Sequence, residues 1–157
     1  MRTIVHIRRA GPDDANRIAE LHRASIQTLC ADAYTPDQIA GWIEPLTPQC
    51  YLSGMAQFEF FVAETDRVIG FCILNTDESE LYAIYFDPET TGNGYGRMLM
   101  RYAEDVARTR GVTELKLKST LNAVGFYGRC GYRKVGDTSH TSSTGLQLPC
   151  VEMIKSL

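Results

Sequence analysis

The stretch "FDPETTGNGYGRMLMRYAEDVA" (residues 86–107) places glycines at positions 92, 94 and 96, directly before a helical pattern of apolar residues. A turn between a strand and a helix usually needs a single glycine. Glycine tolerates positive φ angles and lets a ligand approach the backbone without a Cβ atom in the way. The first N–H groups of a helix have no acceptor inside the helix, and the helix dipole adds positive potential there. The stretch therefore favours a phosphate site over a bare turn.

Two common phosphate-binding motifs do not fit the spacing of these glycines. A P-loop requires G-x-x-x-x-G-K-[ST], and no lysine follows the glycines at the required position. A dinucleotide-binding turn requires G-x-G-x-x-G, but the third position counted from Gly92 is Arg97. Such a turn would also follow the first strand of a βαβ unit, whereas several strands precede the glycines here. Both motifs are disfavoured.

Hydrophobic periodicity around this stretch predicts a mixed α/β domain. The helix over 94–110 carries an apolar stripe through Leu99 and Val106, with Glu104 on its polar side. Hairpin-sized connections before it imply antiparallel strands, and the helix between two later strands implies a central parallel crossover. We expect one domain over 1–157, with a largely antiparallel sheet of about 6–7 strands and four helices. The expected strands are 4–10, 58–64, 68–74, 80–86, 113–119, 132–135 and 151–155, the expected helices are 13–29, 37–44, 94–110 and 123–130, and 136–149 is a polar loop or an irregular hairpin.

The composition disfavours several classes of protein. The chain has 157 residues, a net charge of −3 and a pI of about 5.6, which give no electrostatic reason to expect nucleic acid or an anionic membrane as a partner. No apolar run approaches the roughly 20 residues of a membrane-spanning helix, and the N-terminus does not read as a signal peptide. The five cysteines include no C-x-x-C pair, so we expect no metal site, and free thiols in a reducing cytoplasm.

The residues around the glycines resemble the pyrophosphate loop of the GNAT superfamily of N-acetyltransferases, which bind acetyl-coenzyme A (acetyl-CoA). That loop reads [Q/R]-x-x-G-x-[G/A] and follows a strand that commonly ends in proline, as the strand before Pro88 does. The core Gly94-Tyr95-Gly96 fits this pattern, whereas Thr91 stands at the Gln/Arg position. The segment "YTPDQIAGW" (34–42) further resembles a bacterial branch of the superfamily in which a threonine also replaces that Gln/Arg.

A second stretch, after the next expected strand, resembles the family pattern N-x-x-A-x-x-[FL]-Y-x-x-x-G-[FY]. Thr120 stands where asparagine is usual and can still donate a hydrogen bond, whereas Asn122 lies two positions out of register. The resemblance covers about residues 60–135 well. The matching positions are Ala123, Phe126, Tyr127, Gly131 and Tyr132.

The resemblance implies the GNAT acyl-CoA N-acyltransferase fold, acetyl-CoA as co-substrate, and a small-molecule or peptide amine as acceptor. In the family the amine attacks the thioester directly, a backbone N–H of the strand before the loop meets the thioester carbonyl, and a tyrosine, here Tyr127, protonates the leaving thiolate. The resemblance is also compatible with a homodimer, and the alternative function is a non-catalytic or regulatory acetyl-CoA-binding module. The positions assigned to acetyl-CoA are Ile84, Tyr85, Phe86, Thr91, Gly92, Asn93, Gly94, Tyr95, Gly96, Arg97, Thr120 and Asn122.

The base that deprotonates the amine is left open between Glu80, Tyr82 and water. Because side chains alternate along a strand, we expect Glu80 and Tyr82 on the same face as Ile84 and Phe86. The alternative interpretation of Glu80, which its sequence context favours, is a solvated carboxylate at a strand end in the acidic segment TDESE (76–80). Trp42 also fits a core position, and His140 a solvated loop. The candidates for the acceptor site are Tyr34, Trp42 and His140.

Overall fold

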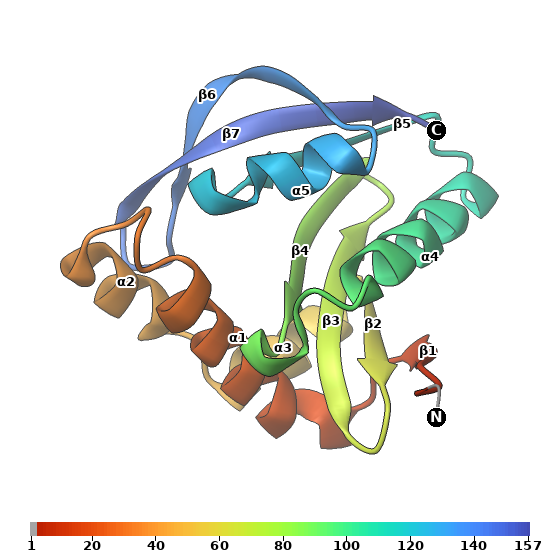
Figure 1. Cartoon of the computed structure of the whole chain (residues 1–157), viewed down its shortest axis with the longest axis horizontal. Helices are drawn as coiled ribbons and strands as arrows, with labels where there is room; N and C mark the ends of the chain where they lie inside the picture. Colours follow the sequence, from red (N-terminus) through yellow and green to blue (C-terminus); the bar gives the residue numbers. More distant parts are fainter. Residues whose placement is uncertain (1–2) are drawn as a thin grey trace.

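The computed structural model describes residues 3–157, and in that range it has one seven-stranded sheet and five α-helices (Figure 1). The strand order is β1-β2-β3-β4-β5-β7-β6, and neighbouring strands are antiparallel except β4 and β5, which are parallel. This arrangement confirms the expected mixed α/β fold with a central parallel crossover. The strands are β1 (His6–Arg9), β2 (Glu59–Glu64), β3 (Val68–Asn75), β4 (Glu80–Phe86), β5 (Glu114–Ser119), β6 (Arg133–Thr141) and β7 (Gln147–Ser156). The helices are α1 (Ala15–Leu29), α2 (Pro36–Ile43), α3 (Pro48–Met55), α4 (Tyr95–Thr109) and α5 (Val124–Arg129).

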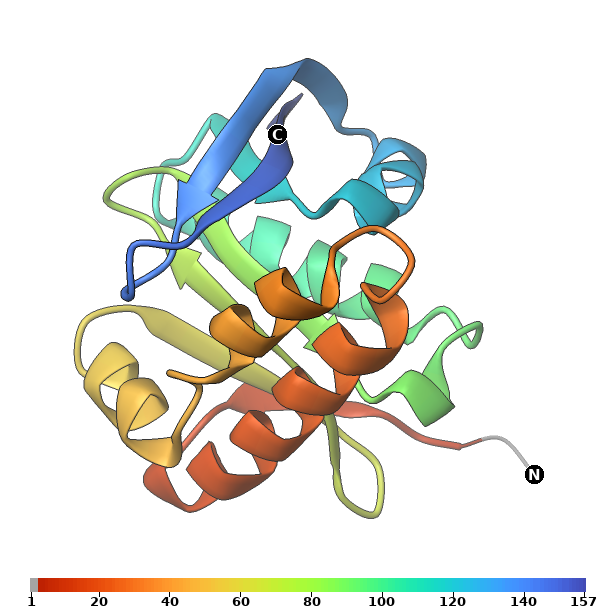
Figure 2. The same ribbon diagram turned by 90° about the vertical axis from the view of Figure 1, so that its left-hand side faces the viewer.

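Helices cover both faces of the sheet, because both faces carry apolar side chains that must be buried. α4 and α5 pack on one face, where Leu99 and Tyr127 join a core cluster with Leu117 of β5. α1 and α3 pack on the other face, around Ile18 and Tyr51, and Figure 2 shows α1 crossing that face. No helix in residues 3–157 is both long enough and apolar enough to cross a membrane.

One helix, α3, is additional to the four that the sequence predicts. It follows Thr47 and takes Pro48 in its first turn, the same kind of start that Thr35 gives to α2. The helix has eight residues, and Tyr51 is the one that is buried. So short a segment with a single buried side chain carries no apolar stripe, and hydrophobic periodicity therefore does not detect it.

The last two strands are longer than the sequence predicts. Residues from Arg133 to Thr141 pair with residues from Gln147 to Ile154 in an antiparallel ladder with a register shift between Lys134 and Gly136. The irregular-hairpin alternative for 136–149 is therefore confirmed, and the polar-loop alternative is wrong. β6 lies at the edge of the sheet and is exposed along most of its length. Because such a strand has no buried face, its sequence lacks the apolar alternation that marks a strand.

Glu104 is buried, which corrects its expected place on the polar side of α4. Its Oε2 accepts a hydrogen bond from the Tyr132 hydroxyl at 2.8 Å, and Lys155 Nζ of β7 lies 3.0 Å from both carboxylate oxygens. A buried carboxylate without such partners would be strongly destabilising. This group of three side chains therefore ties α4 to the last strand.

A β-bulge interrupts the ladder between β3 and β4. Ala83 pairs with Ile73 and Leu81 pairs with Leu74, so Tyr82 is an extra residue on β4 with no partner across the ladder. Leu81 belongs to the core cluster on the α4 side, whereas Ala83 packs on the α1 side. The bulge therefore shifts the alternation of side chains by one residue at Tyr82.

This shift overturns the expected common face for Glu80, Tyr82, Ile84 and Phe86. Ile84 and Phe86 pack on the α4 side, as expected for residues of one face. Glu80 precedes the bulge and comes to the opposite face, where it lines the same cavity as Tyr85. The side chains of Glu80 and Ile84 therefore lie on opposite faces of the sheet.

Candidate active site

Strands β4 and β5 pair over two residues and then separate (Figure 1). Glu80 pairs with Lys116 and Leu81 with Leu117, and beyond Leu81 the edge of β4 has no strand partner on that side. Two cavities open where the strands separate. The first, which we name the loop cavity, has a volume of about 660 Å³ and is lined by the glycine loop. The second, which we name the hairpin cavity, has a volume of about 550 Å³ and is lined by the β6–β7 hairpin. The residues that line both are Leu81, Tyr82, Ala83, Tyr85, Lys118 and Thr120.

The three glycines of the loop have two different structural roles. Gly92 and Gly94 have φ angles of 85° and 79°, and a Cβ atom on either would meet nothing within 4 Å. Gly96 lies in the first turn of α4, where a Cβ atom would come within 3.1 Å of the Phe126 ring. The first two glycines therefore leave open space over a left-handed backbone, and the third allows α4 to approach α5 closely.

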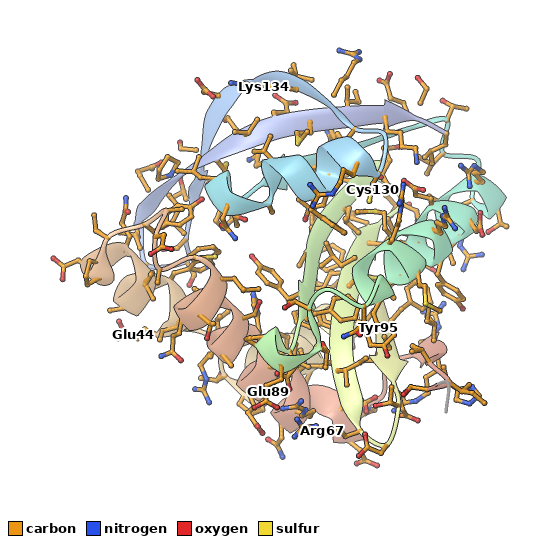
Figure 3. All side chains as sticks on the ribbon, viewed as in Figure 1. Glu44, Arg67, Glu89, Tyr95, Cys130 and Lys134 are labelled. Carbon is orange, nitrogen blue, oxygen red and sulfur yellow. The ribbon has the colours of Figure 1, made fainter. Side chains whose placement is uncertain are left out.

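Six consecutive backbone N–H groups of this loop are available to a ligand. Within residues 3–157, none of the N–H groups of residues 92–97 donates a hydrogen bond to a protein acceptor. Gly94 is the N-cap of α4, so the positive end of the helix dipole points into the same space. Figure 3 labels Glu89 and Tyr95, which bracket the loop. Such an arrangement suits a phosphate group.

The side chains of the loop mostly stabilise the loop itself. Thr91 Oγ1 donates to the Pro88 carbonyl at 3.0 Å, and Asn93 Nδ2 donates to the Thr90 carbonyl at 2.9 Å. Thr91 lines the loop cavity, whereas Asn93 does not. At the edge of the cavity, the Arg97 guanidinium donates to the backbone carbonyl of Arg129 at 3.1 Å, and both arginines line the cavity.

Asp87 fixes the start of the loop to α1. Its Oδ2 accepts a hydrogen bond from Arg17 at 2.6 Å and a longer one from Arg67, and its Oδ1 accepts from the Glu89 N–H at 3.0 Å. Burial alone would raise the pKa of Asp87, but the hydrogen bonds from Arg17 and the Glu89 N–H hold it below its usual range. The carboxylate is therefore charged at neutral pH and holds α1, the β2–β3 turn and the loop together.

Tyr127 faces the loop cavity from α5. Its side chain is buried, and within residues 3–157 its hydroxyl forms no hydrogen bond. Burial, with the nearby Cys130 and Cys72 thiols, raises the pKa of Tyr127, so the phenol keeps its proton at neutral pH. The expected acetyl-CoA positions that line the same cavity are Ile84, Tyr85, Phe86, Thr91, Gly92, Gly94, Tyr95, Gly96, Arg97, Thr120 and Asn122.

Glu80 lies in the hairpin cavity, and its carboxylate forms no hydrogen bond or ion pair within residues 3–157. Burial raises the pKa of Glu80, while Lys116 and Lys118 act in the opposite direction. Tyr82 is 44% exposed, and its hydroxyl accepts a hydrogen bond from Asn75 Nδ2 at 2.7 Å. Glu80 and Tyr82 are the two side-chain candidates for the base. Of these, Glu80 is the one whose polar atoms form no hydrogen bond with a described residue.

The three expected acceptor-site residues all line the hairpin cavity. The Tyr34 hydroxyl donates to the Pro149 carbonyl at 2.6 Å and accepts from the Leu121 N–H at 3.1 Å, so the fold uses this hydroxyl and the ring alone forms a wall. Trp42 packs against that ring with centroids 5.3 Å apart. His140 is an exposed residue of β6, and burial of its ring on the cavity side, together with Lys118, lowers its pKa.

The sequence does not predict a functional role for two side chains that the structure places at the cavities, those of His22 and Tyr85. His22 is 7% exposed, its Nδ1 lies 2.8 Å from the Tyr51 hydroxyl, and within residues 3–157 its Nε2 has no partner. Burial lowers the pKa of His22 to about 3, so the imidazole is neutral. Tyr85 lines both cavities, and its ring lies against His22. A histidine on the apolar stripe of α1, four residues after Ile18, is the signal that could have revealed this pair.

Comparison with known proteins places this geometry in a family. Residues 16–132 match the model of the Acetyltransferase (GNAT) family. The chain is 24% identical to the peptidyl-lysine N-acetyltransferase YjaB of Salmonella typhimurium, over 96% of this chain and 98% of that protein. It is 29% identical to the spermidine N(1)-acetyltransferase of Thermoplasma acidophilum, over 85% of this chain and 91% of that protein.

Solved structures agree with this match. A GCN5-related N-acetyltransferase from Rhodopseudomonas palustris superimposes with a TM-score of 0.91 at 25% identity, over 100% of this chain and 99% of that one. The PaiA N-acetyltransferase of Thermoplasma acidophilum, solved in complex with coenzyme A, superimposes with a TM-score of 0.81 at 24% identity, over 98% and 99%. Among residues 3–157, no group of three or more His, Cys, Asp or Glu side chains could hold a metal ion. The chain belongs to the GNAT family and is an acetyltransferase enzyme.

Proposed function

We propose that the protein transfers an acetyl group from acetyl-CoA to a primary amine by direct attack of the amine on the thioester. The observation that carries this proposal is the meeting of two cavities at the unpaired edge of β4. One cavity lies over a loop with six unbonded N–H groups, and the other contains an unpaired carboxylate. A donor in the first and an amine in the second would meet at Tyr85 in one ternary complex, which aligns the reacting atoms.

On the donor side, the N–H groups of residues 92–97 would hold the pyrophosphate of acetyl-CoA, with Arg97 and Arg129 adding positive charge. The free edge of β4 over 84–86 would hydrogen-bond the pantetheine arm, as a neighbouring strand would. Thr91 would contribute through its backbone, because its hydroxyl is engaged within the loop. Compared with the Gln or Arg of the family pattern, Thr91 therefore lacks a side-chain contact to the ligand, while the cradle of N–H groups stays in place.

On the acceptor side, the amine needs a base, because a free amine with a pKa of about 10 is mostly protonated at neutral pH. Glu80 would take the ammonium proton, directly or through a water molecule, and the amine lone pair would then attack the thioester carbon. We favour Glu80 over Tyr82 because the Tyr82 hydroxyl is hydrogen-bonded to Asn75 at the surface.

The rest of the reaction would proceed at the junction of the cavities. Attack forms the new C–N bond and an oxyanion, to which the Tyr85 hydroxyl and a β4 backbone N–H would donate hydrogen bonds. Collapse of this intermediate breaks the C–S bond. The Tyr127 hydroxyl, which is protonated and faces the loop cavity, would give its proton to the leaving thiolate. The second proton lost by the nitrogen would pass through water to the Tyr127 phenolate, and Glu80 would release the first to solvent. The products are the N-acetylated amine and free CoA.

The named relatives act on a peptidyl lysine and on spermidine, and both acceptors carry primary amines. We extend that chemical class to this protein, with Tyr34, Trp42 and His140 as walls of the acceptor site. The five cysteines are all free, which favours a reducing compartment such as the cytoplasm.

Calorimetric titration with acetyl-CoA tests the donor site. We expect saturable binding that Gly94→Glu abolishes, because the new side chain is strained at positive φ and places a negative charge over the N–H groups. Gly111→Glu is the matched control: Gly111 also has positive φ and open space, but it lies at the other end of α4. Wild-type protein that does not bind acetyl-CoA would refute the proposed function.

A Tyr127→Phe variant distinguishes the enzyme from a regulatory acetyl-CoA-binding module. If the protein is an enzyme, the variant retains acetyl-CoA binding and loses at least about tenfold in amine-dependent CoA release, the usual size of acid catalysis. If the protein is a regulatory module, neither wild type nor variant releases CoA with any primary amine, although both bind acetyl-CoA.

A further inference from the structure

The charged side chains of the hairpin cavity are few, and they are of opposite sign. Glu80 is the carboxylate that lines it and Lys118 is the ammonium, and within residues 3–157 neither takes part in a salt bridge. The two histidines add no fixed charge at neutral pH, since burial lowers the pKa of His22 to about 3 and also lowers the pKa of His140. An acceptor therefore meets one negative and one positive group.

The remaining walls are mostly apolar or aromatic, and Thr120, Ser142 and Ser143 add hydroxyl groups. Tyr34 and Trp42 form an edge-to-face pair on one side, and Tyr82 and Tyr85 come from β4. Leu46, Ile73 and Leu148 complete the apolar lining. Aromatic faces and a carboxylate together suit one ammonium group, because the rings attract a cation and the carboxylate pairs with it. They equally suit an apolar body attached to that ammonium, whose burial is favourable.

A second ammonium on the acceptor would find no second carboxylate among the described residues that line this cavity. With Glu80 paired to the reacting amine, it would lie near Lys118, which repels it. Lys118 projects from β5 and lines both cavities, so it stands close to the place where the reacting amine must sit. A repulsive group of this kind is a common means of rejecting a wrong ligand.

We propose that the acceptor is a monoamine with an apolar or aromatic body, which Glu80 binds through its single ammonium, and that Lys118 excludes diamines and polyamines. This inference rests on the proposed acetyl transfer and narrows its acceptor class. It predicts an acceptor class different from the spermidine named for the Thermoplasma acidophilum relative.

Hexylamine and 1,6-diaminohexane provide a direct test, because they share the same carbon chain and the same reacting group. The measured quantity is the ratio of kcat/KM for hexylamine to kcat/KM for 1,6-diaminohexane. Each rate is measured at pH 8 from the release of the CoA thiol. For wild type we expect a ratio of at least about tenfold in favour of hexylamine, which corresponds to about 1.4 kcal/mol of discrimination. The diamine has two equivalent ends, so statistics alone would favour it.

Variants at Lys118 then test the cause of the discrimination. We expect Lys118→Met to bring the ratio close to one and Lys118→Glu to invert it. Any general effect of these changes on folding or on acetyl-CoA binding cancels, because both amines are measured on the same variant. Lys116→Met is the matched control: Lys116 lies on the same strand and pairs with Glu80 in register, but it does not line the cavity, so the ratio should stay at the wild-type value.

Four outcomes would overturn the proposal. A wild-type ratio near or below one, or a ratio that Lys118→Met leaves unchanged, would reject the assignment to Lys118 while acetyl transfer itself stands. Turnover of spermidine above hexylamine would reject the monoamine class in the same way. The protein could also bind acetyl-CoA but release no CoA with hexylamine, 1,6-diaminohexane, spermidine or a lysine peptide. This result would reject the proposal together with the proposed function.

Discussion

The rings of His22 in α1 and Tyr85 in β4 lie with their centroids 4.2 Å apart, so that a neutral imidazole backs the phenol at the junction of the two cavities. Phe71 packs against both rings, at 5.1 Å from His22 and 6.0 Å from Tyr85. Within residues 3–157 the Tyr85 hydroxyl forms no hydrogen bond, although Tyr85 lines both cavities. The packing holds the ring in place, with its hydroxyl not engaged by any described residue.

Tyr85→Phe should lower kcat by at least about tenfold and leave the affinity for acetyl-CoA within a factor of about three. The reason is that removing one donor to a developing oxyanion typically costs about 10²–10³ in kcat, and the second donor from the backbone remains. Steady-state kinetics and calorimetry measure the two effects separately. Tyr102→Phe is the control, because Tyr102 packs on Phe61 outside both cavities and should behave as wild type. An unchanged kcat in Tyr85→Phe would remove Tyr85 from the mechanism.

His22→Leu should flatten the acid limb of the stability curve. The folded-state pKa of His22 is about 3, and an unfolded histidine titrates near 6.5, so the unfolded chain binds the extra proton between these values. The contribution of His22 to the free energy of unfolding of wild type is therefore complete above about pH 6.5. It is lost as the pH falls, with a slope approaching 1.4 kcal/mol per pH unit. Urea unfolding of both proteins between pH 7.5 and pH 5 gives the comparison. Parallel curves would show that His22 is not held neutral by the fold.

Glu80→Gln should lower kcat/KM by at least about tenfold and remove the acidic limb of the pH–rate profile. Because burial raises the pKa of Glu80, wild-type activity should fall with decreasing pH at a value above the ordinary 4.3 of glutamate. Glu78→Gln is the control, since Glu78 is exposed in the same turn and outside the cavity. If the variant kept the acidic limb, water or another group would be the base.

Asp87→Asn should weaken acetyl-CoA binding by about tenfold, because the loop loses its ion pairs with Arg17 and Arg67 and must be ordered by the ligand. The pKa of Asp87 is depressed in the folded state. Its contribution to stability is therefore complete above about pH 4 and is lost as the pH falls through the depressed value. The thermal unfolding temperatures of wild type and variant should approach one another as the pH falls from about 4 and converge below the depressed pKa of Asp87. Asp105→Asn, which breaks an exposed pair on α4, should leave acetyl-CoA affinity unchanged.

Much of the fold can be read from the sequence because its signals are local. The alternating strands, the crossover helix and the glycine loop each depend on periodicity or on backbone freedom that single residues reveal. The structure gives Gly92 and Gly94 the positive φ angles that three closely spaced glycines suggest, and it shows that Gly96 is small because Phe126 lies against it. The last reason depends on a tertiary contact, which the sequence does not contain.

The errors have the same physical origin. Nothing in "ELYAIYF" (80–86) distinguishes a bulged residue from a regular one, so the reversal of faces at Tyr82 depends on the partner strand. Glu104 is buried because Tyr132 and Lys155, which are distant in sequence, neutralise it. His22 looks like a core residue on α1, and its importance becomes visible only when β4 brings Tyr85 beside it. Sites assembled by long-range contacts exceed what a pattern along the chain can predict.

The central claim is that an amine and acetyl-CoA react directly across the edge of β4. Incubating the protein with ¹³C-acetyl-CoA and hexylamine, and quantifying both products by mass spectrometry, tests it most directly. We expect labelled N-acetylhexylamine and free CoA in equal amounts, with both lost in Gly94→Glu and retained in Gly111→Glu. Free CoA accompanied by labelled acetate, with no labelled amide from hexylamine, spermidine or a lysine peptide, would contradict it.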